Sequence, residues 1–189
     1  IQDKGMVFIL GKSGSGKSTL LNVLGGLDQF NEGEIIICGK SSQNFKQSDF
    51  DSYRNTFIGF IFQDYSLLDN MNLMDNIALP LALGCKKSKE IEEKVIAIAD
   101  TFGLKEHLKK YPYELSGGQK QRGAAARALI TNPSVIFADE PTGALDSKSS
   151  SDLLECLRRV NEEKKATIIM VTHDALSASY TQKVYVLSD

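Results

Sequence analysis

A glycine-rich segment near the start of the chain has the residues to bind phosphates. Residues 11–18 read GKSGSGKS, which matches the spacing G-x-x-x-x-G-K-[ST]. Gly14 and Gly16 permit a backbone path around phosphate groups, and the N–H groups at the start of a following helix would be donors. Lys17 adds a cation for the β and γ phosphates, and the loop hydroxyls are further candidate ligands: Ser13, Ser15, Ser18, Thr19. The pattern predicts a site for a nucleoside triphosphate, with Ser18 suited to Mg²⁺. A glycine-rich turn before an ordinary helix is the alternative.

Two consecutive carboxylates follow an apolar run in the last third of the chain. Residues 135–138 read VIFA, and Asp139 and Glu140 come next. Carboxylates at the end of a buried strand are costly unless they are used. We expect Asp139 to hold Mg²⁺ together with Ser18, and Glu140 to orient or deprotonate the water that attacks the γ-phosphate. The alternative is a solvated turn, because proline, threonine and glycine follow.

Gln63 and His173 each follow a predicted strand. In a parallel sheet both would lie at the same edge as the phosphate loop. Gln63 could contact Mg²⁺ or the attacking water. His173 could bind the γ-phosphate and hold Glu140 in place. The other histidine, His107, lies in a polar helical stretch, and we interpret it as structural.

The segment 115–119 reads LSGGQ and has two interpretations. Ser116 and Gln119 have the spacing of a capping box for the helix that follows. Capping does not require Gly117 and Gly118, each of which lowers helix propensity by about 1 kcal/mol relative to alanine. Glycines here indicate close approach of a ligand, and a capped helix N-terminus is a second anion site. Because the phosphate loop already encloses its phosphates, a second anion site suggests a composite site.

The elements that must position these residues alternate between strand and helix. This alternation predicts an α/β fold with a mostly parallel sheet flanked by helices. A helical pattern interrupts it over about 72–131. The expected strands are 6–10, 34–37, 57–62, 135–138, 167–171 and 184–187, and the expected helices outside 72–131 are 18–27, 150–164 and 175–180.

Length and composition restrict the class of protein. A chain of 189 residues is consistent with one domain. Its net charge of −2 does not favour nucleic-acid binding. The longest apolar stretch, 77–83, is far shorter than the ~18 residues of a membrane span. The cysteines Cys38, Cys85 and Cys156 form no CxxC pair, which favours reduced, buried thiols in a cytosolic protein.

Together these motifs resemble those of the nucleotide-binding subunit of an ABC transporter, over essentially the whole chain. GKSGSGKST (11–19) resembles the Walker A motif, Gln63 the Q-loop glutamine and LSGGQ the ABC signature. VIFADE (135–140) resembles the Walker B motif with its glutamate, ALD (144–146) the D-loop, and His173 the switch histidine.

The resemblance implies an ATPase with a P-loop NTPase core and a helical subdomain that carries the signature. The core would comprise about 1–71 and 132–189, and the helical subdomain about 72–131. The resemblance also implies a head-to-tail homodimer that binds two ATP molecules with Mg²⁺. Each phosphate loop would face Ser116 of the other subunit, with Gly117, Gly118 and Gln119 beside it, and Asp146 would link the two sites.

A finer resemblance concerns the membrane partner. Segments 58–81, 111–122 and 138–150 are similar to exporters for lipoproteins, macrolides and antimicrobial peptides, and AAARALI (124–130) leans toward the bacitracin type. This implies a transmembrane permease, separate or fused, that holds the protein at the cytoplasmic face of the cell membrane. The expected docking region is about 67–83. Its apolar residues either contact the permease or form core: Leu67, Leu68, Met71, Leu73, Met74.

The same motifs leave another class open, an ATP-gated module without transport, such as a cell-division regulator. A DNA-repair ATPase is disfavoured, because the 51 residues of segment 64–114 are too few for a long coiled coil. A translation factor usually carries two such domains and more basic charge.

Two features depart from the family pattern. Gly123 stands where the family usually has an aliphatic residue, and it should weaken its helix by about 1 kcal/mol. Ten residues precede Gly11, whereas the family's adenine-stacking aromatic lies further upstream. We therefore expect a single ATPase domain, 1–189, cut at both ends from a longer protein.

Overall fold

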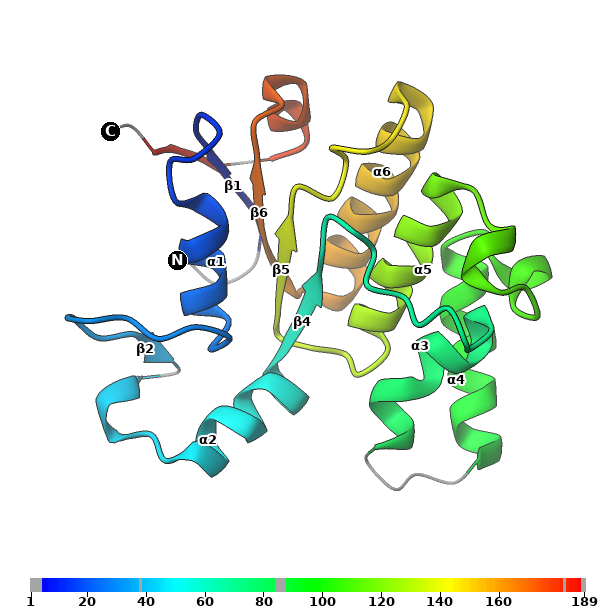
Figure 1. The fold of residues 1–189 in the computed structure, drawn as a ribbon, viewed down its shortest axis with the longest axis horizontal. Coiled ribbons are helices and arrows are strands. Elements are labelled where there is room, and N and C mark those ends of the chain that lie inside the picture. The colour runs from blue at the N-terminus through cyan, green and yellow to red at the C-terminus, as the bar shows by residue number, and fades with distance from the viewer. Residues whose placement is uncertain (1–4, 38, 84–87, 182, 188–189) are drawn as a thin grey trace.

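Five parallel strands form the central sheet. The structure is a computed structural model that describes residues 5–37, 39–83, 88–181 and 183–187. The strands lie in the order β4-β5-β6-β1-β7 (Figure 1). Their bounds are Met6–Leu10 (β1), Ile58–Ile61 (β4), Val135–Asp139 (β5), Thr167–Thr172 (β6) and Lys183–Val186 (β7). Every pairing in this sheet is parallel, which confirms the predicted α/β class.

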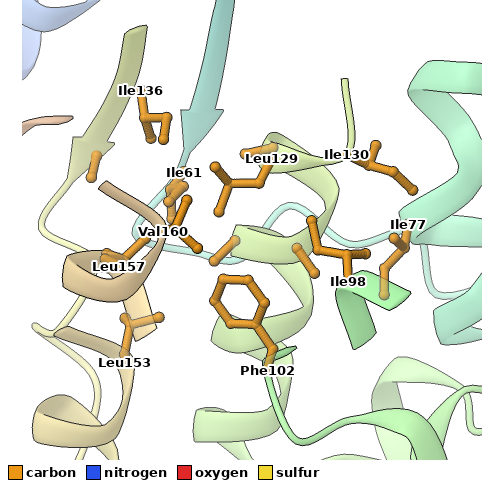
Figure 2. Packing of buried hydrophobic residues seen from close by; sticks show 14 of the residues in the cluster. Ile61, Ile77, Ile98, Phe102, Leu129, Ile130, Ile136, Leu153, Leu157 and Val160 are labelled. Carbon is orange, nitrogen blue, oxygen red and sulfur yellow. The ribbon is translucent and has the colours of Figure 1, made fainter. Parts of the chain in front are cut away.

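Alternate residues of the central strands pack into two hydrophobic layers. In β5, Ile136 and Ala138 belong to one layer, whereas Phe137 belongs to the other together with Leu21. Figure 2 shows the first layer, where Ile136 and Ile61 lie among residues from the neighbouring helices. Because side chains alternate across a strand, a sheet covered on both faces needs apolar residues at nearly every position. This explains the continuous apolar runs in the sequence.

Helices cover both faces of the sheet. α1 (Lys17–Leu24) supplies Leu21 to one layer, and α5 (Gly117–Leu129) and α6 (Ser147–Lys164) pack in the other. α1 ends before the expected position 27 because Gly25 and Gly26, which have weak helix propensity, follow it. α6 begins at Ser147 rather than 150, because the Asp146 side chain caps it.

The segment that was expected to be helical contains α3 (Leu73–Ala82), α4 (Ser88–Thr101) and α5, with short 3₁₀ turns η3 (Lys105–His107) and η4 (Pro112–Glu114). The close packing of α3 on α5 explains Gly123. A Cβ atom at Gly123 would lie 2.6 Å from Cδ1 of Leu73, whose side chain is fully buried. Leu73 is therefore core and not part of a docking surface, whereas Leu68 is 41% exposed.

The region after α1 differs from expectation. The strand expected at 34–37 is reduced to β2 (Ile36–Ile37), which pairs antiparallel with β3 (Lys40–Ser41) in a separate small sheet. It does not join the parallel sheet. Three further elements were not predicted: the 3₁₀ turn η1 (Ser42–Asn44), α2 (Gln47–Ser52) and a π-helical turn, η2 (Tyr53–Phe57). The polar sequence of this region has no clear apolar period, so it carried no signal for them.

The last elements match expectation in kind. The short helix at Ala175–Tyr180 is a 3₁₀ helix, η5, and β7 begins one residue earlier than predicted.

Among the described residues, none of the helices combines the length and apolar character needed to cross a membrane. Cys156 is a free, half-buried thiol, and burial raises its pKa. Cys38 and Cys85 lie outside the described residues.

Candidate active site

The phosphate loop lies between β1 and α1, as predicted. Gly14 and Gly16 have φ angles of 83° and 84°, a left-handed conformation that favours glycine. Lys17 is 4% exposed, and its ammonium donates a hydrogen bond to the carbonyl oxygen of Lys12 at 2.7 Å, inside the loop. The N-cap residue of α1 is Gly16, which has no side chain to cap the helix. The first N–H groups of α1 are therefore available to an anion.

One atom of this loop supports a phosphate ligand directly. The hydroxyl oxygen of Ser15 is buried and has no hydrogen-bond partner within the part of the chain that the structure describes. A buried hydroxyl is normally paired, so an unpaired one in an anion-binding loop fits a phosphate oxygen. Ser13, Ser18 and Thr19 are exposed around the same loop. The loop residues named from the sequence thus lie together.

The Walker B carboxylate contacts the phosphate loop. The Ser18 hydroxyl donates to Oδ1 of Asp139 at 2.9 Å. Burial raises the pKa of Asp139, and the hydrogen bond from Ser18 lowers it; the nearby Glu140 raises it and Lys17 lowers it. A hydroxyl beside a partly desolvated carboxylate is a donor set that suits Mg²⁺. The described residues contain no cluster of three acidic, histidine or cysteine side chains for a metal, so nucleotide oxygens and water would complete the shell.

Glu140 and His173 form the next contact along the sheet edge. Nδ1 of His173 lies 3.0 Å from Oε2 of Glu140. Glu140 has a φ of 41°, unusual for a residue with a side chain, and its N–H donates to the carbonyl of Val171 in β6 at 2.9 Å. The Glu140 side chain is 18% exposed and that of His173 is 59% exposed. The predicted pairing of these two residues is present.

Gln63 lies two residues beyond the end of β4, whose last paired residue, Ile61, is opposite Ala138, so Gln63 and Glu140 each follow the carboxyl end of adjacent parallel strands. The loop that carries it is held from α5. Gln121 Nε2 donates to the carbonyl of Phe62 at 3.2 Å, and Arg127 donates to the carbonyls of Tyr65 and Ser66 at 3.1 and 2.5 Å. Burial lowers the pKa of Arg127, and Asp64 raises it.

Sequence reasoning missed Gln121 and Arg127. Each lies about sixty residues from its loop partner, and local patterns do not reveal such contacts. Tyr65 and Ser66, which follow Gln63 by two and three residues, both have positive φ angles that add strain to this loop. A loop under strain needs such hydrogen bonds to hold one conformation.

The signature segment forms the predicted capping box. Gln119 N–H donates to Ser116 Oγ at 3.3 Å, and Ser116 N–H donates to Gln119 Oε1 at 2.9 Å. The glycines have a packing role that we did not expect. A Cβ at Gly118 would lie 2.8 Å from Ser149 Oγ in α6, and one at Gly117 would lie 3.1 Å from the Tyr65 hydroxyl. His107 also contacts this segment, through Gln119.

Asp146 lies at the start of α6, next to the signature. Its carboxylate accepts hydrogen bonds from Ser149 N–H at 2.9 Å and from Ser149 Oγ at 2.7 Å, which lower its pKa. The signature and the Asp146 turn are therefore neighbours. Figure 1 shows that the phosphate loop, between β1 and α1, lies well apart from the N-terminal end of α5, with β5 and α6 between them.

A glycine-rich anion loop at the carboxyl end of one parallel strand, with a carboxylate at the end of a strand two places away in the sheet, defines a P-loop nucleotide-binding protein.

The ABC transporter family model matches residues 1–143. The bacitracin export ATP-binding protein BceA of Halalkalibacterium halodurans is 51% identical, over 97% of this chain and 72% of its own length. The lipoprotein-releasing ATP-binding protein LolD of Bdellovibrio bacteriovorus is 40% identical, over 96% of this chain and 82% of its own length. The macrolide export ATP-binding/permease protein MacB of Syntrophobacter fumaroxidans is 43% identical, over 97% of this chain and 26% of its own length.

Solved structures of the same family have the fold of this chain. The dimeric ABC transporter cassette MJ0796 has a TM-score of 0.91 and 37% identity, covering 99% of this chain and 82% of that one. A dimeric post-hydrolysis state of the same cassette is bound to ADP and Pi, with a TM-score of 0.91 and 36% identity. The chain belongs to the ABC transporter family, as an ATP-binding ATPase cassette.

Proposed function

We propose that the chain hydrolyses ATP at two composite sites of a head-to-tail homodimer and thereby powers a membrane permease. The observation that carries this proposal is that the phosphate loop lies apart from the N-terminal end of α5 within one chain (Figure 1), and Ser116 caps that end. A second copy could bring its Ser116 to the phosphate loop, and Asp146 would lie beside the dimer interface. The cassette MJ0796 is dimeric, which supports a dimer for this chain.

The contacts around the phosphate loop support a role for each proposed residue. Lys17, Ser13, Ser15, Thr19 and the N–H groups of Gly14 and Gly16 would hold the phosphates. Ser18, Asp139 and Gln63 would hold Mg²⁺, which when bound would neutralise charge on phosphate oxygens. The signature residues of the partner would bind the same nucleotide: Ser116, Gly117, Gly118, Gln119.

Glu140 would orient the attacking water and accept its proton. His173 supports this role, since it lies 3.0 Å from the Glu140 carboxylate and can hold that group while it contacts the γ-phosphate. Gln63 would contact the water or the metal from the adjacent strand. Arg127 and Gln121 would keep its loop in place.

We further propose that residues 1–71 and 132–189 form a RecA-like core and that 72–131 form a helical subdomain, which docks the permease. A groove of about 710 Å³ runs between β4 and α3, lined in part by Phe60, Phe62, Leu79, Pro80 and Leu83. Leu83 is 78% exposed. Arg127 lines the same groove and also holds the Q-loop, so a partner seated there would be linked to Gln63. This arrangement would place the ATPase at the cytoplasmic face of a membrane.

The proposed direction of transport is export. BceA, LolD and MacB are named for bacitracin export, lipoprotein release and macrolide export. We infer a cargo of this general kind, a peptide, lipoprotein or drug. The permease would be separate or fused to this chain, and MacB is named as ATP-binding protein and permease together.

The experiment is a pull-down of the full-length protein carrying Glu140→Gln, with ATP and Mg²⁺, from detergent-solubilised native membranes. Recovery of a polytopic membrane protein, or its presence on the same chain, supports the transport role. A matched sample carrying Leu83→Glu in addition should recover less permease while still binding ATP. Recovery of soluble partners alone would overturn the transport role and favour an ATP-gated module.

A further inference from the structure

His107 contacts the signature motif from outside it. Its Nε2 atom lies 3.1 Å from Nε2 of Gln119. His107 ends the turn η3, whereas Gln119 lies in the first turn of α5. No local pattern connects these two residues, because His107 lies in a polar stretch several residues before the motif.

The other hydrogen bonds of Gln119 decide the direction of this contact. Gln119 Oε1 accepts the backbone N–H of Ser116 at 2.9 Å, so the oxygen end of the amide is already in use. The Nε2 end is a donor only. The Nε2 atom of His107 must therefore accept, which places the imidazole proton on Nδ1. An imidazole protonated on Nε2 would set two donors against each other.

The other ring nitrogen of His107 indicates that its contact with Gln119 matters. Nδ1 of His107 is buried and lacks a hydrogen-bond partner among the residues that the structure describes. A buried polar atom without a partner is uncommon and unfavourable. His107 thus keeps its contact with Gln119 although its other nitrogen stays unpaired. A purely structural histidine would gain more from a position in which both nitrogens are paired.

We propose that His107 is a positioning residue for the composite ATP site, acting through Gln119. Its Nε2 orients the Gln119 amide, and the amide oxygen then binds the Ser116 N–H and closes the capping box. In the closed box Ser116 Oγ accepts from the Gln119 N–H, a contact that does not use the Ser116 hydroxyl proton. That proton can be donated to a phosphate oxygen of the ATP bound to the partner subunit. This inference rests on the proposed head-to-tail dimer.

The test measures ATP-driven dimerisation of the full-length ATPase carrying Glu140→Gln, by analytical ultracentrifugation over a range of ATP concentrations. His107→Phe keeps a planar ring and removes the acceptor. We expect the ATP concentration for half-maximal dimerisation to rise about five-fold, the effect of one ordinary hydrogen bond. His107→Gln can place an amide oxygen near the former Nε2 atom and should restore dimerisation. His107→Leu, which also lacks an acceptor, should behave like His107→Phe.

A double variant separates positioning from a general structural effect. If His107 acts through Gln119, His107→Phe should have no further effect in a Gln119→Ala background. Equal dimerisation of His107→Phe and His107→Gln would overturn the proposal, as would additive effects of His107→Phe and Gln119→Ala. Ser116→Ala tests the underlying dimer: if it leaves ATP-driven dimerisation unchanged, the composite site itself is wrong, whatever the His107 variants do.

Discussion

The imidazole Nδ1 of His173 lies 3.0 Å from Oε2 of Glu140, across the carboxyl ends of the adjacent strands β5 and β6. Glu140 has a left-handed backbone conformation, and residues in such sparsely populated conformations carry a cost of about 1–3 kcal/mol. Its N–H bond to Val171 holds the strained turn in place. A strained carboxylate that is fixed from two sides suits a group that must meet a water molecule at a defined position.

Glu140→Gln should bind ATP but hydrolyse it at least about 100-fold more slowly, because the amide cannot accept a proton. The variant should accumulate as an ATP-bound dimer. Steady-state phosphate release and gel filtration with ATP would measure both effects. Turnover at the wild-type rate would show that another group activates the water.

Lys17→Ala should weaken ATP binding by about 100-fold, because the variant lacks the ammonium group that would donate hydrogen bonds to the phosphates. Lys12→Ala is the matched control in the same loop. Lys12 contributes a backbone carbonyl to Lys17 and its own side chain is exposed, so its replacement should have little effect. Isothermal titration calorimetry of both variants makes the comparison, and equal losses would contradict the role of Lys17.

Asp139→Asn should stabilise the metal-free protein at neutral pH and abolish Mg²⁺-dependent hydrolysis. Burial raises the pKa of Asp139, so the folded protein binds more protons than the unfolded chain between the ordinary carboxyl pKa and the raised one. Stability therefore falls as pH rises through that window, and the full penalty is present above it. Asparagine removes the charge and keeps an acceptor for Ser18.

Thermal unfolding of the metal-free wild type and Asp139→Asn at a series of pH values checks the predicted direction of this pH dependence. The stabilisation by Asp139→Asn should shrink as pH falls through the raised pKa and vanish below the ordinary one. Excess chelator should stop hydrolysis by the wild-type protein. A stabilisation that grew toward low pH, or hydrolysis that survived chelation, would contradict the assignment.

Gly123→Ala should lower the stability of the protein, although alanine is the better helix former. The added Cβ would lie 2.6 Å from Leu73 Cδ1, and overpacking of this kind costs about 1–3 kcal/mol. The gain in helix propensity is about 1 kcal/mol. Leu73→Val shortens the opposing side chain, so the effect of Gly123→Ala should be smaller in that background. Chemical denaturation of the four proteins would measure the coupling, and strict additivity would refute the contact.

Arg127→Met should release the Q-loop without unfolding the chain. The variant loses two hydrogen bonds to the carbonyls of Tyr65 and Ser66. We expect faster amide hydrogen exchange over 62–66 and a several-fold lower kcat at unchanged nucleotide affinity. Arg158→Met, which removes exposed ion pairs in α6, is the control and should change neither. Unchanged exchange in Arg127→Met would mean that other contacts hold the loop.

Local chemistry was enough to predict several parts of this site. β1 occupies the predicted residues 6–10, and the Ser116–Gln119 capping box is present, because strands and caps depend on adjacent residues. Glu140 and His173 also lie in contact as expected, since parallel strands bring their carboxyl ends to one edge. The hairpin of β2 and β3, α2 and the turn η2 were not predicted, because their polar sequence has no clear period.

The sequence alone predicts a chemistry for the protein: residue types suited to bind phosphate, hold a divalent metal and activate water, with strands and helices alternating around them. How separate elements pack shows which distant residues lie beside those groups. Arg127 reaches the Q-loop across 61 residues, His107 supports Gln119, and Gly123 makes room for Leu73. Such contacts depend on how separate elements pack, and a period or a motif reports only on the element in which it lies.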